Sequence, residues 1–329
     1  ILIEVASYFN YFWDMVFFIG ISIYSNSFGI PFVFDDEQNI VYNPFIKDLR
    51  FFVNSEMFEG IAFDKTFHDN TVKDFFKSRI IGYFTFAINY NQHYLDVIGY
   101  HIINLFIHIM SGILVYLLML FTLRTPYFNG VFSGGRFYGE LLAILPALLF
   151  ISHPIQTQAV TYIVQRFASL ATMFYLLSMA CYIKFRLKQE EGLGYRGDKV
   201  KTWVYYVGAL ITAVLAMKTK ETAFTLPLVI IAYEHMFFGS ITKKRLKYLI
   251  PIVLTMLIIP ATLLGNLNAS EAVKIASSKE IGSLDYLFTQ FRVVITYIRL
   301  LFLPINQNLD YDYKVYRTLW DIEVAASMI

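Results

Sequence analysis

Apolar runs long enough to cross a lipid bilayer recur along this chain. A helix needs roughly 20 such residues to span the hydrocarbon core. The clearest runs are Tyr100 to Thr122, Arg166 to Tyr182, Thr222 to Phe238 and Leu249 to Leu264. Shorter, interrupted or less defined runs are Leu141 to Ser152, Trp203 to Met217, Tyr286 to Leu303 and one within Val5 to Ile30. With 57% hydrophobic and only 16% charged residues, the composition is not that of a water-soluble domain. We therefore predict an all-α, polytopic transmembrane helical bundle with about eight or more spans.

The charges between these runs predict which ends face the cytoplasm, because Lys and Arg collect in cytoplasmic loops. Basic residues are concentrated in Lys184 to Lys201 and in Lys243 to Lys247, so both segments and the N-terminus should be cytoplasmic. Counting spans then places residues 26–96, 153–165 and 218–221 on the non-cytoplasmic face. The first of these mixes acidic and Phe residues, which predicts short amphipathic helices lying in the membrane interface.

The extent of the apolar runs, the net charge and the cysteine count bear on domain organisation and on the functions that are excluded. We interpret residues 1–329 as a single membrane domain, and we expect the protein to continue beyond Ile1 and Ile329 because the chain stops within an apolar stretch. A net charge of +2 gives no indication of nucleic-acid binding. Cys181 is the one cysteine, so neither a disulfide framework nor a cysteine metal site can form within the chain.

The first polar cluster on the predicted outer face contains adjacent carboxylates at Asp35, Asp36 and Glu37. Ionisable groups near the hydrocarbon boundary are costly unless they are paired or hydrated. Neighbouring carboxylates repel, which can raise one pKa and create a general base or a cation site. The alternative interpretation is a solvated acidic loop.

Two further clusters carry positive charge. His153 and Arg166 flank a donor-rich turn that could hold an anionic headgroup, although a helical turn with a snorkelling Arg would have the same sequence. Lys218, Lys220 and Glu221 form a tight turn that places cations on the disfavoured side of the membrane. That position suggests a phosphate partner, and an interfacial anchor is the alternative.

Two histidines fall on one face of an apolar run. His101 and His108, with Asn104 between them, have a spacing compatible with two metal ligands, but such groups more often bridge helices by hydrogen bonds. No Gly-rich phosphate loop, HExxH or Gly-x-Ser-x-Gly pattern is present in the sequence, so nucleotide-dependent and metalloprotease functions have no support.

Several of these patterns resemble those of the GT-C membrane glycosyltransferases, and in particular the transmembrane and tetratricopeptide-repeat O-mannosyltransferases and their bacterial relatives. The similar motifs are Phe34-Asp35-Asp36 with Asn39 and Asn43-Pro44, Asn89-Tyr90, Gly99-Tyr100-His101 with Asn104 and His108, His153-Pro154 with Thr157 and Arg166, Lys220-Glu221 with Leu226-Pro227, and Leu303-Pro304 with Asp310-Tyr311. They keep the family order from about residue 30 to 313. Gln158 replaces the usual Glu, and Ile80-Ile81 follows Arg79 where the family typically has Pro-Leu. In this family a soluble repeat domain would follow Ile329.

The resemblance implies transfer of a sugar, expected to be mannose, from a polyprenyl-phosphate carrier to a hydroxyl of a protein or glycan on the non-cytoplasmic side. That side is the periplasm, the cell exterior or the lumen of the endoplasmic reticulum. It implies Asp36 as the general base, with Asp35 as its competitor or orienting partner. The candidate contacts to the donor phosphate are Arg166, His153, Lys220 and, more weakly, Arg79, and Glu221 would orient them.

Direct displacement would invert the anomeric centre, and no nucleotide cofactor is required. A divalent cation at Asp35 and Asp36 is compatible with this chemistry but is not needed. A non-catalytic lipid-binding scaffold or a transporter would use the same outward polar groups without chemistry. The inverted repeats and paired broken helices of many transporters are not evident in the sequence.

Overall fold

The computed structural model describes residues 14–53, 76–128, 136–192, 196–240, 242–266 and 282–327. Its described residues form helices and connecting segments without a strand, which confirms the all-α prediction. The chain divides into two compact units, Ile1–Leu263 and Leu264–Ile329. The prediction of one membrane domain over residues 1–329 stays a prediction.

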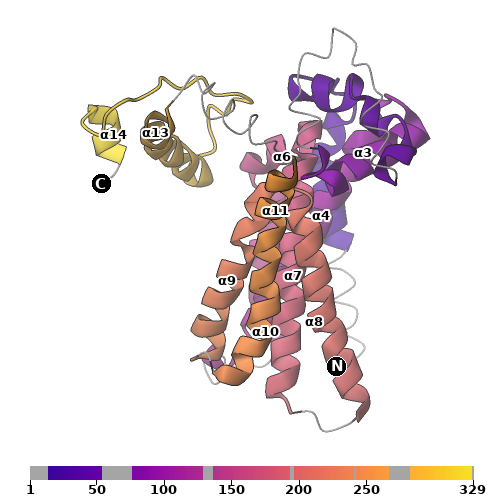
Figure 1. Ribbon diagram of the computed structural model, residues 1–329, viewed down its shortest axis with the longest axis vertical. Helices are drawn as coiled ribbons and strands as arrows, with labels where there is room; N and C mark the ends of the chain where they lie inside the picture. The colour runs from indigo at the N-terminus through magenta and orange to yellow at the C-terminus, as the bar shows by residue number, and fades with distance from the viewer. Residues whose placement is uncertain are drawn as a thin grey trace. The chain divides into compact units, whose positions relative to one another are not determined.

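Long antiparallel helices make up the larger unit (Figure 1). After a helical segment at residues 14–24, the helices are α3 (Ile80–His93), α4 (Val97–Thr122), α5 (Arg136–Ser152), α6 (Thr157–Thr161), α7 (Arg166–Glu190), α8 (Arg196–Met217), α9 (Leu226–Tyr233), α10 (Lys243–Leu254) and α11 (Ile258–Asn266). Helix α7 lies at the centre, packed against α4 and α8, and α4 also packs against α5.

Four described helical segments have the length and composition of a membrane span: Val97–Thr122, Ile163–Glu190, Val200–Met217 and Arg245–Thr262. A fifth is possible if Gly139–Ser152 and Pro154–Thr161, which meet at 49°, form one bent span. This confirms a multi-pass membrane bundle. The count of about eight spans stays a prediction.

The predicted span from Thr222 to Phe238 is helical along its whole length but changes helix type twice, and its crossing of the membrane stays a prediction. It consists of a 3-10 helix at Glu221–Thr225, the short α9, and a π-helix at Glu234–Phe238. Pro227 lies in the first turn of α9, where its missing N–H costs nothing. The π-helix begins at Glu234, whose buried side chain is drawn to Arg186 of α7.

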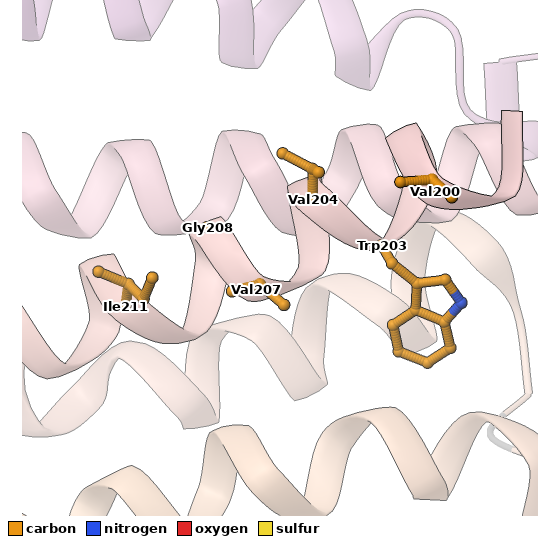
Figure 2. Close-up of a pocket in the computed structure, with 6 residues that line it drawn as sticks. All are labelled: Val200, Trp203, Val204, Val207, Gly208 and Ile211. Carbon is orange, nitrogen blue, oxygen red and sulfur yellow. The ribbon is translucent and has the colours of Figure 1, made fainter. Parts of the chain in front are cut away.

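Helix α8 presents an apolar face away from its neighbours. A groove of about 550 Å³ follows this face and is lined by Val200, Trp203, Val204, Val207, Gly208 and Ile211. Figure 2 shows these side chains along a single helix, with the indole nitrogen of Trp203 as their one polar atom. An outward apolar face of this kind is what a lipid-facing helix requires.

Where it is described, the first outer segment contains a series of short helical turns, and their predicted place in the membrane interface stays a prediction. These turns are Ser25–Ser27, Glu37–Val41, Pro44–Ile46 and Leu49–Phe52, followed by α3. Asn43 caps the third of these turns and Asp48 the fourth, each through a side-chain oxygen that accepts a backbone N–H. Residues 54–75 of the predicted interfacial region lie outside the described residues.

The smaller unit contains α13 (Ser283–Phe302) and α14 (Ile322–Ser327). The backbone N–H of Tyr316 donates to Thr289 of α13, and its phenol donates to Glu323 of α14. Tyr316 therefore connects the two helices of this unit.

Candidate active site

The three polar clusters predicted for the outer face gather at one end of the α4–α7–α8 bundle. This end holds the start of α4, the end of α5, the start of α7 and the end of α8. Asp36 accepts a hydrogen bond from Val164, which joins the first two clusters. Helix α3 joins the third to the first, because its Ile81 N–H donates to the Lys218 carbonyl and its Tyr83 donates to Asn39. The structure thus brings together residues separated by up to about half of the chain.

Asp36 connects the first outer segment to the turn that precedes α7 by a hydrogen bond. Its Oδ1 accepts the N–H of Val164 at 2.7 Å, its Oδ2 accepts the N–H of Val33 at 3.1 Å, and its side chain is buried. Burial raises the pKa of Asp36 to about 6, and the two backbone hydrogen bonds counteract that rise. Both carboxylate oxygens of Asp36 are therefore occupied, and an acceptor hydroxyl has little access to them.

Asp35 is held differently, by its main chain. Its N–H donates to the phenol oxygen of Tyr162 at 3.0 Å, and its carbonyl accepts from Asn39 at 2.9 Å, while the residue is exposed. The preceding Phe34 has a φ of 48°, a left-handed conformation that costs a bulky residue about 1–3 kcal/mol. The fold fixes the backbone at Asp35 and leaves its carboxylate accessible, so the geometry favours Asp35 over Asp36 as the base.

Arg166 lies at the centre of the packing beneath this segment. Its Nε donates to Asn104 Oδ1 at 2.7 Å, its Nη1 to Asn89 Oδ1 at 2.5 Å, and its Nη2 to the Tyr100 carbonyl at 2.9 Å. The guanidinium also lies over the ring of Phe86, 4.4 Å from its centroid, and the residue is fully buried. Arg166 therefore ties α3, α4 and α7 together. Its direct contact with a donor phosphate stays a prediction, and this geometry favours a positioning role instead.

His153 occupies the bend between α5 and the following turn. Its Nδ1 accepts the N–H of Ile155 at 3.2 Å, which caps a 3-10 helix beginning at Pro154. The side chain is half-buried at the same end of the bundle as Asp36. Its contact with the donor phosphate also stays a prediction.

Arg79 and Glu221 form a forked ion pair at the start of α3. Arg79 Nε lies 3.1 Å and 3.2 Å from the two Glu221 oxygens, and Arg79 Nη2 lies 3.0 Å from Oε2. Ser78 donates to the same carboxylate at 3.1 Å. Burial would raise the pKa of Glu221, but the hydrogen bonds from Arg79 outweigh it and hold the pKa below its usual value. Glu221 is therefore ionised and orients Arg79.

Lys220 is the neighbour of Glu221 in the sequence. Among the described residues its ammonium has no hydrogen-bond acceptor, although the residue is half-buried. Burial lowers the pKa of Lys220, and the neighbouring Arg79 lowers it further. Lys218, by contrast, donates to Thr262 of α11 at 2.7 Å. Lys220 is thus the cation of this turn that is available to an anion.

Helix α3 connects the carboxylate cluster with this basic turn. Arg79 immediately precedes α3, and Tyr83, one turn later, donates to Asn39 at 2.8 Å. A Cβ on Gly82 would lie 2.3 Å from the Phe167 ring, so α3 approaches the start of α7 closely. Sequence analysis did not identify Tyr83, although its position four residues after Arg79 places both on one helical face.

Of the two histidines of α4, His108 bridges to a second helix, which is the interpretation that the sequence favoured, whereas His101 contacts the non-helical residue Ile30. His101 Nε2 lies 2.9 Å from the Ile30 carbonyl, and His108 Nε2 lies 3.1 Å from the Ile151 carbonyl. Within the described ranges, no group of three or more His, Cys, Asp or Glu residues is placed to hold a metal ion. Metal dependence was left open by the sequence and is not addressed by this geometry.

Comparison with known proteins supports the resemblance that the motifs indicated. The human protein O-mannosyl-transferase TMTC2 is 28% identical over 233 residues, which cover 69% of this chain and 24% of that protein. The Caenorhabditis elegans protein O-mannosyl-transferase F38B6.6 is 30% identical over 178 residues, 53% of this chain and 23% of that protein. The chain is similar to the protein O-mannosyl-transferases. The human protein O-mannosyl-transferase TMTC4 is 29% identical over 214 residues, which cover 63% of this chain and 27% of that protein.

The predicted resemblance to O-mannosyltransferases is confirmed by these relatives. The chain spans about a quarter of the length of the curated relatives it matches. No family model and no solved structure matches it.

Proposed function

We propose that this chain carries the membrane-embedded catalytic site of a protein O-mannosyltransferase, which transfers mannose from a polyprenyl-phosphate donor to a protein hydroxyl. The observation that carries the proposal is the convergence of an accessible carboxylate, Asp35, and an unpaired cation, Lys220, at one end of the bundle. Acid-base and electrostatic groups of these two kinds are what transfer from a phosphate ester requires.

In the proposed step, the Asp35 carboxylate accepts the proton of the acceptor hydroxyl as its oxygen attacks the anomeric carbon. The bond between that carbon and the phosphate oxygen breaks, and the polyprenyl phosphate leaves with the electron pair. Attack from the side opposite the phosphate inverts the anomeric centre, so a β-linked donor gives an α-mannoside. We place this site on the non-cytoplasmic side of the membrane.

Lys220 is proposed to stabilise the negative charge of the leaving phosphate, with Arg79 nearby and oriented by Glu221. Arg166 is proposed to contribute to phosphate binding through the electrostatic potential of its buried charge. Its charge is buried among neutral amides and carbonyls with no described carboxylate in direct contact, so it keeps positive potential that the nearby Asp36 offsets only in part. The site can therefore attract a phosphate even without direct contact from Arg166.

The test is mannosyl transfer by the full chain in nanodiscs, with polyprenyl-phosphate mannose as donor and a Ser/Thr-containing acceptor. Asp35→Asn should lower transfer by roughly 10²- to 10⁴-fold, the contribution of a general base, while leaving thermal stability unchanged. Lys220→Gln should also lower transfer. Glu37→Gln, an exposed charge removal in the same segment, is the matched control and should retain activity.

Two results would contradict this assignment. Full transfer by Asp35→Asn together with loss in a folded Asp36→Asn variant would return the base to Asp36. Absence of transfer in the unaltered chain, combined with retention of the donor lipid, would identify a lipid-binding scaffold instead of an enzyme.

A further inference from the structure

A second group of charges lies at the opposite end of the bundle, where α4 and α7 end and α10 begins. Three described carboxylates at this end are paired. Glu234 contacts Arg186 at 3.0 Å and Arg245 at 3.5 Å, and Glu190 contacts Arg186 at 3.0 Å. Glu191 contacts Lys188 at 2.6 Å. These three carboxylates therefore leave no negative charge free for further cations.

Two cations at this end have no such partner. Among the described residues, neither Arg124 nor Lys184 has a hydrogen-bond acceptor or an ion-pair partner. Lys184 lies with its ammonium 5.0 Å from the centroid of the Phe121 ring. Arg124 and Lys188 are close enough to Lys184 to repel its charge, and Glu191, already bound to Lys188, is the acidic group that opposes this repulsion.

Local structure holds the two cations together. Helix α4 ends at Thr122, and the next residues turn back through hydrogen bonds from Arg124 N–H to the Phe121 carbonyl and from Thr125 N–H to the Thr122 carbonyl. This turn keeps the backbone of Arg124 next to Phe121, whose ring contacts Lys184, and Arg124 is near enough to act on the charge of Lys184. Two cations kept at close range, neither of them bonded to a carboxylate among the described residues, favour the binding of an anion.

The surroundings indicate where the anion comes from. Tyr127 follows the turn and is 64% exposed, and its ring contacts Phe237 at 5.8 Å. Exposed aromatic rings at the end of a membrane span are typical of the lipid headgroup level. We propose that Arg124 and Lys184 bind the phosphate of an anionic phospholipid at this end of the bundle, remote from the proposed transfer site.

Native mass spectrometry of the full chain tests the proposal, with phosphatidylglycerol as the probe and phosphatidylcholine as the zwitterionic comparison. The unaltered chain should retain phosphatidylglycerol more strongly. Each cation near an anionic lipid is worth roughly a fivefold change in affinity, so Arg124→Gln and Lys184→Gln should each weaken retention by about that factor and the double variant by about thirtyfold.

The matched control removes two exposed cations of α10 at the same end, Lys243→Gln with Lys247→Gln, and should change retention little. Equal loss in this control would overturn the specific site and leave only general attraction to the basic end. Equal retention of both lipids, or displacement of phosphatidylglycerol by inorganic phosphate at matched concentration, would also overturn it. Because Arg124 is exposed, Arg124→Gln should fold, and its lipid retention tests the proposal even if Lys184→Gln does not fold.

Discussion

Two buried arginines lie on the same helix, α7, and are held by partners of different charge. Arg166, at the start of the helix, is surrounded by the amide oxygens of Asn89 and Asn104 and by backbone carbonyls. Arg186, near the other end, forms an ion pair with the fully buried Glu234. A guanidinium held by neutral dipoles keeps its positive potential, whereas one held by a carboxylate does not. The first arrangement suits an end that attracts a phosphate donor, and the second suits an end that holds helices together.

The largest effect should come from removing one partner of the charged pair. Arg186→Met leaves Glu234 buried with Arg245 as its remaining ionic contact at 3.5 Å, and unpairing a buried charge costs about 3–5 kcal/mol. The expected result is a large fall in the thermal unfolding temperature of the detergent-solubilised chain. Glu234→Gln combined with Arg186→Met should recover much of that loss, because no buried charge remains. Failure of the double variant to recover would show that packing, not charge, is responsible.

A smaller effect is expected at the other end of α7. Arg166→Met leaves unpaired amide and carbonyl groups but no unpaired carboxylate in direct contact, so we expect a cost of about 1–3 kcal/mol. Thermal unfolding of both single variants under the same conditions makes the comparison. If Arg166→Met lowers the free energy of unfolding as much as Arg186→Met or more, the charge of the partners does not explain the difference between the two arginines.

The last effect concerns pH and is confined to the site end. The pKa of Asp36 is raised from its ordinary value of 3.8 to about 6 in the folded protein, so the folded state binds this proton more tightly than the unfolded chain does. The contribution of Asp36 to stability is therefore full below about pH 4 and is lost as the pH rises through 6. Unfolding temperatures measured across this window should fall for the unaltered chain and fall less for Asp36→Asn. Identical slopes would show that Asp36 does not titrate in this range.

Much of the architecture was predictable because membrane spans are encoded locally. The run of apolar residues from Tyr100 to Thr122 predicted α4 to within three residues at its start, since the hydrocarbon core demands both length and continuous apolarity. Parity counting along the chain placed the Asp35, His153 and Lys220 clusters at one end, as the structure has them. The change of helix type at the buried Glu234 was not predictable from local sequence, because its partner Arg186 is distant in the sequence.

The sequence by itself determined the helical membrane class, the shared end of the three polar clusters and the resemblance to the O-mannosyltransferases. Only the tertiary structure decided what each charge does. It showed Asp36 bound to two backbone N–H groups, Arg166 held by asparagines, and Asp35 and Lys220 available. The physical reason is that hydrophobicity and loop charge act through local runs of residues, whereas the availability of a carboxylate or an ammonium depends on donors and acceptors supplied by distant segments.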